Sequence, residues 1–482
     1  MPPQAEVRDF PADGLRRRQG SATTVPDDAS ERVYTWQEVA KHNTAHSAWV
    51  IVGSKVYDLT SWVDNHPGGR EVLLLMAGRD ATAAFESYHP FTDKPRKILG
   101  KFEVGAVSNH EFPQYRPDSG FYSTMNKRLA AYFKENKLNP KSPWPGVWRM
   151  ILVSACAVAC FLACNNFWAG ALPPWARVLA AAAFGVLQAM PLLHVMHDSS
   201  HTAFGNSQAW WSYGGRLFMD FYAGANMTSW HYQHVVGHHI YTNVYQADPD
   251  LPVADEGDPR RLVDRQTWKP LYQYQHLYLP PLYGILGLKF RIQDLTDTFF
   301  GGKNGPVRVN PISTYRWAEM WLSKIVWALW RIVLPLKCFD ISQGQFWALF
   351  LVSEWMTGYF LAFNFQVSHV STECEYPLGE KHSEAISDEW AVSQVKSSVD
   401  YGHDSWLTAF FSGALNYQVT HHLYPGVSQY HYPAIAPIIK QTCKEFGVEY
   451  RCLPNFASAF WAHIKHLKNM GERGVPAEVH MG

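Results

Sequence analysis

Four long apolar runs lie in the middle of the chain, and each is long enough to cross a bilayer as a helix. They occupy residues 149–170, 175–196, 318–339 and 346–367. Pro173–Pro174 leaves only a short turn between the first two, so we expect the runs to pair as helical hairpins. Lys324 and Arg331 interrupt the third run and would have to snorkel or line a protein interior. The pattern predicts an all-α membrane domain with about four transmembrane helices.

The polar and apolar pattern before the first run predicts a separate soluble module. Residues 34–43, YTWQEVAKHN, have the pattern of a capped helix, and residues 49–63 alternate like strands around a turn at Gly53–Ser54. We therefore expect a soluble α+β domain over residues 31–107. The other divisions are a disordered polar tail at 1–30, a linker at 108–147, the membrane domain at 148–470 and a tail at 471–482.

The composition fits a protein that contacts a membrane. Aromatic residues make up 15% of the chain, with 20 tryptophans, whereas charged residues make up only 17%. Two less apolar stretches, 209–225 and 279–290, are expected to lie as helices in the membrane interface. Lysine plus arginine and aspartate plus glutamate balance at 42 each, so nothing indicates a nucleic acid as partner. The seven scattered cysteines include no CxxC pair and argue against a disulfide framework.

The soluble module contains two histidines suited to holding a flat ligand. His66 begins the sequence HPGG, in which Pro67, Gly68 and Gly69 make a tight turn without obstructing side chains. His89 follows 23 positions later, after apolar and small residues. Two facing imidazoles in an apolar crevice suit a low-spin haem built for electron transfer. The strand, the HPGG turn and the second histidine together resemble cytochrome b5, and the resemblance implies haem b.

Three histidine groups outside that module predict a metal centre. They are HDSSH at 197–201, HYQHVVGHH at 231–239 and QVTHH at 418–422. Helical spacing puts on common faces His197 with His201, His234 with His238 beside His239, and Gln418 with His421 and His422. Clustered imidazoles repel one another when protonated and are costly to bury unpaired. A bound metal ion removes both problems, since imidazole suits iron, copper, zinc and nickel.

Topology places the three histidine groups on one side of the membrane. The first group follows the second apolar run, the second group lies in the same loop, and the third follows the fourth run. An even number of spans separates them, so all three face the compartment of the soluble module. His369 lies at the end of the fourth run, at the depth expected for the first group. It is a further candidate ligand, although polar groups at a span end can also lie among lipid headgroups.

The number and type of these ligands indicate two iron ions. Seven histidines, or eight with His369, are too many for one tetrahedral zinc. An all-imidazole site beside an electron-delivering haem favours redox chemistry and hence iron. A pair of irons can store two electrons, bind O2 and abstract hydrogen from an unactivated methylene group. The membrane setting makes an acyl chain the expected substrate.

These motifs together resemble the front-end fatty-acyl desaturases that carry a fused cytochrome b5 domain. The resemblance rests on HPGG, HDxxH, HxxxHH and a third box that begins with glutamine, Gln418, and it covers nearly the whole chain beyond residue 30. The flanking stretches QHVVGHHIYTN, ADPDLP, RVNPIST and LNYQVTHHLYPGVSQYHYP look most like the Δ5-acting members. This implies conversion of dihomo-γ-linolenoyl to arachidonoyl and of eicosatetraenoyl to eicosapentaenoyl chains with O2. It also implies NADH-cytochrome b5 reductase as electron donor and a multi-pass endoplasmic reticulum protein whose haem domain and histidine boxes are cytosolic.

By the same resemblance, seven histidines are the iron ligands. They are His197, His201, His234, His238, His239, His421 and His422. His369 matches a further ligand of the related stearoyl-type desaturases, and Gln418 would be a weak or indirect ligand. Asp198 and Asp404 could accept hydrogen bonds from ligand rings, or could be solvated acids.

Other functions remain open from the residues alone. The same iron site could serve a Δ4, Δ6 or Δ8 desaturase, a sphingoid-base desaturase or a hydroxylase. A different class of function is a haem-regulated metal transporter, whose polar ligands would lie inside the spans near the membrane midplane. The histidine groups here follow the ends of spans instead, and this placement favours the enzyme.

Overall fold

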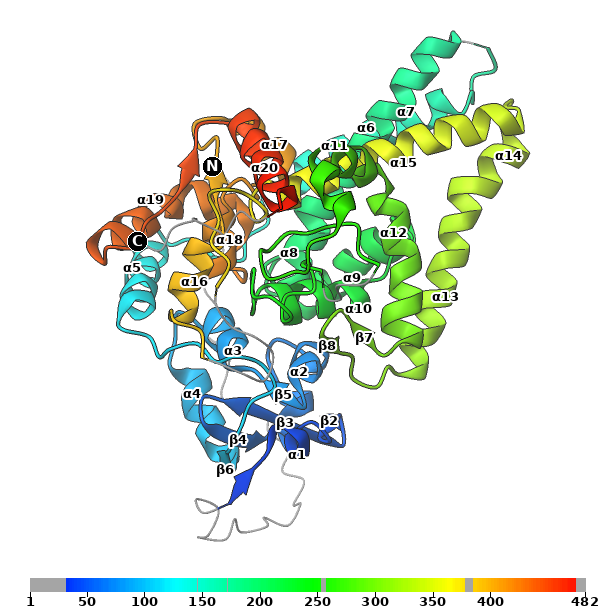
Figure 1. Cartoon of the computed structure of the whole chain (residues 1–482). Helices are drawn as coiled ribbons and strands as arrows, with labels where there is room; N and C mark the ends of the chain where they lie inside the picture. Colours follow the sequence, from blue (N-terminus) through cyan, green and yellow to red (C-terminus); the bar gives the residue numbers. More distant parts are fainter. Residues whose placement is uncertain (1–31, 145, 171, 253–256, 378–384, 474–482) are drawn as a thin grey trace.

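The computed structural model describes residues 32–144, 146–170, 172–252, 257–377 and 385–473. The tail expected at 1–30 and nearly all of the tail expected at 471–482 lie outside these ranges. A small N-terminal module with a β-sheet sits at one end of the molecule, and a larger helical domain follows it (Figure 1). Three long helices project from the far side of that domain.

The N-terminal module is built around a mixed sheet. Its strands, in the order β1-β6-β4-β3-β2 with β5 beside β3, are β1 (Val33–Tyr34), β2 (Asn43–Thr44), β3 (Ser47–Val52), β4 (Lys55–Asp58), β5 (Arg79–Asp80) and β6 (Glu103–Val107). Its helices are α1 (Trp36–Val39), the 3₁₀ helix Thr60–Asn65, α2 (Arg70–Met76), α3 (Thr82–Tyr88) and α4 (Lys94–Leu99). The expected capped helix is α1, where Thr35 and Glu38 form a reciprocal capping box. The expected strand turn is also present, with Gly53 at φ 63° between β3 and β4.

Three described helices are long and apolar enough to cross a membrane. They are α6 (Gly146–Cys164), the run Pro174–Ser200, and α15 (Gln343–Gln366). The run Pro174–Ser200 comprises α7 (Pro174–Pro191), a π-helical turn at Leu192–Met196 and α8 (His197–Ser200). Gly185 lies against the backbone of Ser353, so the absence of a side chain lets α7 and α15 pack closely. This part of the chain is a membrane protein by composition and helix length.

The remaining predicted span, at 318–339, is helical but more polar than the other three. It comprises α13 (Thr314–Ala328), a π-helical turn at Leu329–Val333 and α14 (Leu334–Cys338). Its charges face the protein interior: Lys324 Nζ lies 2.6 Å from Asp294 Oδ2, and buried Arg331 lies 3.4 Å from Glu354. Of the two placements that the sequence allowed for these charges, the structure has the internal one.

The rest of the helical domain consists of shorter elements. They are α5 (Phe121–Glu135), α9 (Gln208–Arg216), α10 (Met227–Trp230), α11 (Gln275–Leu282), α12 (Leu286–Gln293), α16 (Trp390–Lys396), α17 (Trp406–Ser412), α18 (Gln418–Leu423), α19 (Tyr432–Glu445), α20 (Phe456–Gly471), and the two-residue strands β7 (Lys303–Asn304), β8 (Val307–Arg308), β9 (Asp400–Tyr401) and β10 (Cys452–Leu453). The segment expected as a linker at 108–147 contains α5, whose residues Phe121, Met125 and Leu129 are buried in a core shared with α18 and α19. The predicted interfacial stretches at 209–225 and 279–290 are both helical.

Candidate metal and haem sites

Three short helical segments carry the histidine groups into the centre of the helical domain. The first group lies on α8 with His201 at its end, the second on a π-helical segment at His231–His238 with His239 after it, and the third on α18. All seven box histidines, together with His369 and Gln418, are buried. These residues are far apart in sequence but buried together. The tertiary fold, and not one local motif, therefore assembles the site.

The buried imidazoles form two adjoining clusters with a bridge between them. In one cluster the ring nitrogens of His197, His201, His234 and His421 lie within 4.8 Å of one another, and in the other those of His238, His369 and His422 do so. His239 joins His421 and His422 at the same spacing, between the two clusters. Contacts between facing Nε2 atoms are as short as 3.1 Å, from His197 to His234 and from His422 to His369. Two clusters of this kind match the number of ions expected from the sequence.

Hydrogen bonds on the outer nitrogen orient five of the eight rings. Each of these rings has its Nδ1 against a partner: Tyr88 Oη for His201 (2.7 Å), Asp248 for His238 (3.1 Å), the Ser397 carbonyl for His369 (3.1 Å), Tyr432 Oη for His421 (3.1 Å) and Gln394 Oε1 for His422 (2.9 Å). Nε2 is therefore left for the interior of the cluster in every case. Outer partners of this kind fix the tautomer and orientation of metal-binding histidines.

The electrostatics of the clusters favour neutral imidazole, which is the form that binds metals. Burial, together with neighbouring histidines, holds the pKa of His201, His234, His239, His421 and His422 well below the usual range. Burial likewise lowers the pKa of His369 to about 3. Where the single proton of a neutral ring lies on the outer Nδ1, its inward Nε2 has no proton, and two such Nε2 atoms cannot hydrogen-bond one another. Indeed, the buried Nε2 atoms of His201 and His421 have no hydrogen-bond partner. A cation between the rings would satisfy them.

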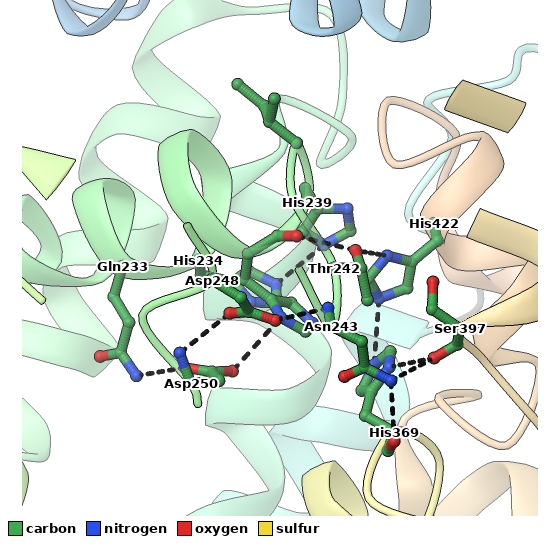
Figure 2. A network of polar contacts seen from close by, with 12 residues as sticks. Gln233, His234, His239, Thr242, Asn243, Asp248, Asp250, His369, Ser397 and His422 are labelled. Atoms are coloured by element: carbon green, nitrogen blue, oxygen red, sulfur yellow. Dashed lines mark hydrogen bonds and ion pairs between the residues drawn. The ribbon is translucent and has the colours of Figure 1, made fainter. Parts of the chain in front are cut away.

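His238 is the exception, because two carboxylates lie behind it. Burial alone would lower its pKa, but Asp248 and Asp250 outweigh burial and raise the pKa of His238 to about 9. Asp248 is itself held in place by the backbone N–H groups of Asn243 (2.8 Å) and Asp250 (2.9 Å). Figure 2 shows Asp248 with Asn243 and Asp250 and, beside them, His422 close to His369 and Ser397. The arrangement gives one cluster an anionic support that the other lacks among the residues described.

Gln418 extends into the second cluster. Its terminal amide nitrogen lies 2.8 Å from His369 Nε2, the atom that also faces His422. Its amide oxygen is buried and has no hydrogen-bond partner. The two ends of the amide are interchangeable by a side-chain flip. Either orientation leaves the Gln418 amide within reach of an ion held by His369 and His422.

The module brings the rings of its two candidate haem ligands close together. The rings of His66 and His89 have centroids 6.3 Å apart, a spacing that accommodates one metal ion with bonds of about 2 Å to each ring. Each Nδ1 is held by a backbone carbonyl, that of Gly69 (3.3 Å) or Phe85 (2.8 Å), so Nε2 is free on both rings. A side chain on Gly68 would collide with the His66 ring. These residues fit a bis-histidine haem.

An apolar cavity adjoins the first histidine cluster. Its lining includes His197 and Trp230 at the histidines and otherwise mostly aliphatic and aromatic side chains, namely Leu192, Leu193, Met196, Met219, Phe290, Leu361 and Phe365. The free volume is about 40 Å³, close to that of one or two water molecules. An acyl chain would therefore enter only as these side chains move apart. The cavity thus connects an apolar lining to His197 of the cluster.

Two acids expected near the rings have other roles or no contact. Asp198 accepts hydrogen bonds from Ser428 Oγ (3.0 Å) and Gln429 Nε2 (3.0 Å), and it joins α8 to the segment before α19. Asp404 is exposed. Asp404 thus fits the alternative of a solvated acid, whereas buried Asp198 is neither solvated nor the partner of a clustered ring among the described contacts. Asp248 has that position instead, and its only sequence signal was its place in the quoted stretch ADPDLP. Tyr88 and Gln394 were missed because their partners are distant in sequence.

Comparison with known proteins identifies both parts of the chain. Residues 173–454 match the family model "Fatty acid desaturase", and residues 35–108 match "Cytochrome b5-like Heme/Steroid binding domain". "Delta(5) fatty acid desaturase A" of Dictyostelium discoideum is 41% identical over 91% of this chain and 94% of its own length. "Acyl-lipid (8-3)-desaturase" of Mortierella alpina is 37% identical over 92% and 98%. "Acyl-lipid (7-3)-desaturase" of Rebecca salina is 30% identical over 88% and 90%.

Proposed function

Because the chain belongs to the fatty acid desaturase family and carries a cytochrome b5-like domain, we propose that it is a front-end desaturase acting at Δ5. The proposed reaction places a new double bond between an existing one and the carboxyl end, as in the conversion of dihomo-γ-linolenoyl to arachidonoyl. The Δ5 position is supported by relatives named Delta(5) or (8-3), which are more similar to this chain than a relative named (7-3). The observation that carries the proposal is the double histidine cluster beside an apolar cavity.

The eight clustered histidines and Gln418 would hold two iron ions. Such a pair, when bound, supplies O2 activation and removal of hydrogen from an unactivated methylene group. The chain's own residues would position the iron ligands and exclude water from the substrate. Outer partners keep Nε2 of five of these rings directed inward, and the apolar lining would exclude water from the methylene groups of the substrate. His197 lines both the cavity and the cluster, so a chain in an enlarged cavity would lie beside the first cluster.

His66 and His89 would hold haem b, which supplies single electrons received from NADH-cytochrome b5 reductase. Pro67, Gly68 and Gly69 form the turn that leaves room for the flat ligand, and Gly69 adopts φ 96°, where a side chain would be strained. The module is docked against the helical domain, so this electron source needs no diffusional encounter with the iron site. The fused arrangement therefore favours rapid delivery of successive electrons.

We also propose four transmembrane helices: the three apolar helices and, in addition, the charged run Thr314–Cys338, which precedes α15. Its internal ion pairs remove the main objection to burying it in a membrane. Four spans leave the three histidine groups and the haem module in one compartment, the cytosol, with the protein in the endoplasmic reticulum membrane. With three spans, α15 would separate the third group from the first two, and the clusters of the structure could not form.

Feeding experiments test the proposed reaction. The chain is expressed in a host that lacks polyunsaturated lipids, dihomo-γ-linolenate is supplied, and double-bond positions in the products are mapped. We expect arachidonate, and none from the matched variant His421→Ala, which lacks a cluster nitrogen. Other defined fatty acids are supplied in parallel cultures. New double bonds that appear only at Δ4, Δ6 or Δ8 of those acids would refute the Δ5 position but not desaturation. A hydroxylated product instead would refute desaturation itself.

A further inference from the structure

One side chain of the N-terminal module contacts the outer edge of the first histidine cluster. Tyr88 Oη lies 2.7 Å from His201 Nδ1, and the two rings are nearly parallel, at an interplanar angle of 20°. Tyr88 is the last residue of α3, and the next residue in the chain is the candidate haem ligand His89. We propose that Tyr88 is a positioning residue that couples the haem to the iron site through His201. This inference rests on the proposed function.

Tyr88 differs in origin from the other outer partners of the clustered rings. The partners of His238, His369, His421 and His422 all belong to the helical domain. Among the ring contacts of the described residues, Tyr88 alone brings a group from the module. A partner needed only to orient an imidazole could come from the helical domain, as it does for the other four rings. Its place beside the haem ligand therefore indicates a second role.

The path from His89 to His201 is short and almost entirely covalent. It runs from the His89 ring along one peptide unit to the Tyr88 side chain and then across one hydrogen bond. The His89 ring is fixed by its Nδ1 bond to the Phe85 carbonyl, so its free Nε2 is directed to the haem position. Electron tunnelling is more efficient through bonds and a hydrogen bond than across an empty gap. This path therefore competes well with direct transfer through space.

Docking contacts hold Tyr88 against His201. Arg308 of the helical domain pairs with Glu111 (2.7 Å), and its neighbour Asn310 donates to the carbonyls of Leu74 (2.8 Å) and Ala77 (2.9 Å). At the beginning of α2, Glu71 contacts Arg216 of the helical domain at 3.2 Å. These contacts come from both ends of α2 and from the segment after β6. The module is thereby fixed in an orientation that presents the end of α3 to the clusters.

The coupling step transfers one electron and breaks no bond. With haem held by His66 and His89 and irons held by the clustered histidines, the ferrous haem would supply the electron and become ferric, and one ferric ion of the pair would become ferrous. With Nε2 directed at the cluster, His201 carries its proton on Nδ1 and donates it in a hydrogen bond to Tyr88 Oη. That proton stays on the imidazole throughout. The Tyr88 ring contributes its orbitals and its position, and is neither oxidised nor deprotonated.

The test uses the full-length protein with both cofactors and the variant Tyr88→Phe, which removes the hydroxyl but keeps the ring. The haem is reduced, mixed with O2 and acyl substrate, and its reoxidation is followed by stopped-flow absorbance. We expect reoxidation to slow by about tenfold to a hundredfold, the range typical for loss of a partner of a metal ligand. The haem spectrum, the haem potential and the non-haem iron content should be unchanged. Tyr88→Trp, which cannot accept the His201 proton, should behave alike.

The matched control is Tyr115→Phe. Tyr115 packs in the same cluster between module and helical domain as Tyr88, but its hydroxyl donates to the Ile240 carbonyl (2.8 Å) instead of a ring. Its reoxidation rate should stay close to wild type. The proposal is overturned if Tyr88→Phe with full haem and iron reoxidises at the wild-type rate, or if its slow rate is explained by lost iron. If wild-type haem is not reoxidised faster with acyl substrate, the proposed function fails rather than this inference.

Discussion

The two cofactor sites of this protein are built in opposite ways. His66 and His89 belong to one compact module. In sequence, His66 precedes α2 and His89 follows α3, so a short stretch of chain brings the two rings together. The iron clusters draw on α8, the segment 231–239, His369 and α18, which meet only when the membrane helices pack. The haem site should therefore survive disturbances of the helical domain, whereas the iron site depends on the whole fold. The comparison implies that each cofactor can be lost without the other.

The largest effect is expected from removing a ligand of the assembled site. His422→Ala takes one of three imidazole nitrogens from its cluster and leaves His238, His369 and the weaker amide of Gln418. We expect loss of non-haem iron and no detectable turnover, with an unchanged haem spectrum. Elemental analysis and absorbance on one preparation check both parts. Parallel loss of haem would show that the two sites are not independent.

The converse variant removes a ligand of the local site. His66→Ala should abolish the haem spectrum and leave the non-haem iron bound, since the module contributes no ligand to the clusters. Desaturation should stop as well, unless a separate cytochrome b5 is supplied. The decisive control is therefore a host or a purified system without one. Full activity there without haem would contradict the role of the module as electron source.

An intermediate effect is expected from the carboxylate behind His238. Asp248→Asn keeps the shape of the side chain but removes its charge, and such outer partners are worth about tenfold to a hundredfold in metal affinity. We expect iron affinity at pH 9 to fall by that factor. Asp404→Asn, at an exposed acid of the same domain, should have no effect. An equal fall in both variants would mean that general charge, and not Asp248, matters.

The same carboxylates set a pH dependence. They raise the pKa of His238 to about 9, so at neutral pH the free imidazole holds a proton that iron must displace. Iron binding to the metal-free protein should therefore tighten as pH rises from 7 to 9, by up to about tenfold per unit. Asp248→Asn lowers that pKa and should flatten the dependence, so the two proteins should differ less at pH 7 than at pH 9. Binding titrations at both pH values decide the matter.

The smallest effect concerns Gln418. An amide is a weaker ligand than imidazole, so Gln418→Ala should lose less iron than His421→Ala, although both side chains come from α18. Metal analysis after equal dialysis against a chelator compares them. Equal losses would give Gln418 the standing of a full ligand.

Residue spacing predicted which histidines cluster better than it predicted the groups that orient them. The boxes put His197, His238 and His422 on helical faces, and the fold brings those faces together. Asp248 was missed because it lies in a loop ten residues from His238, whose ring it contacts. Tyr88 was missed because it lies in a different domain from its partner His201. Such partners depend on tertiary packing, for which a single sequence carries no periodic signal.

Hydropathy had a similar limit for the membrane helices. It identified α6, the run Pro174–Ser200 and α15 from their apolar length. It could not decide Thr314–Cys338, since the cost of burying Lys324 and Arg331 depends on partners supplied elsewhere in the fold. In the haem module, the local patterns predicted α1 and the β3–β4 turn, whereas the two-residue strands β1, β2 and β5 carry no periodic signal of their own.

One chain is expected to hold both an electron-delivering haem and a separate pair of irons. The decisive measurement is the haem and total metal content of the purified full-length protein and of His422→Ala. We expect one haem and two non-haem irons per wild-type chain, with the variant keeping its haem and losing non-haem iron. Two zinc ions in place of iron, or a single non-haem iron that survives in His422→Ala, would contradict it.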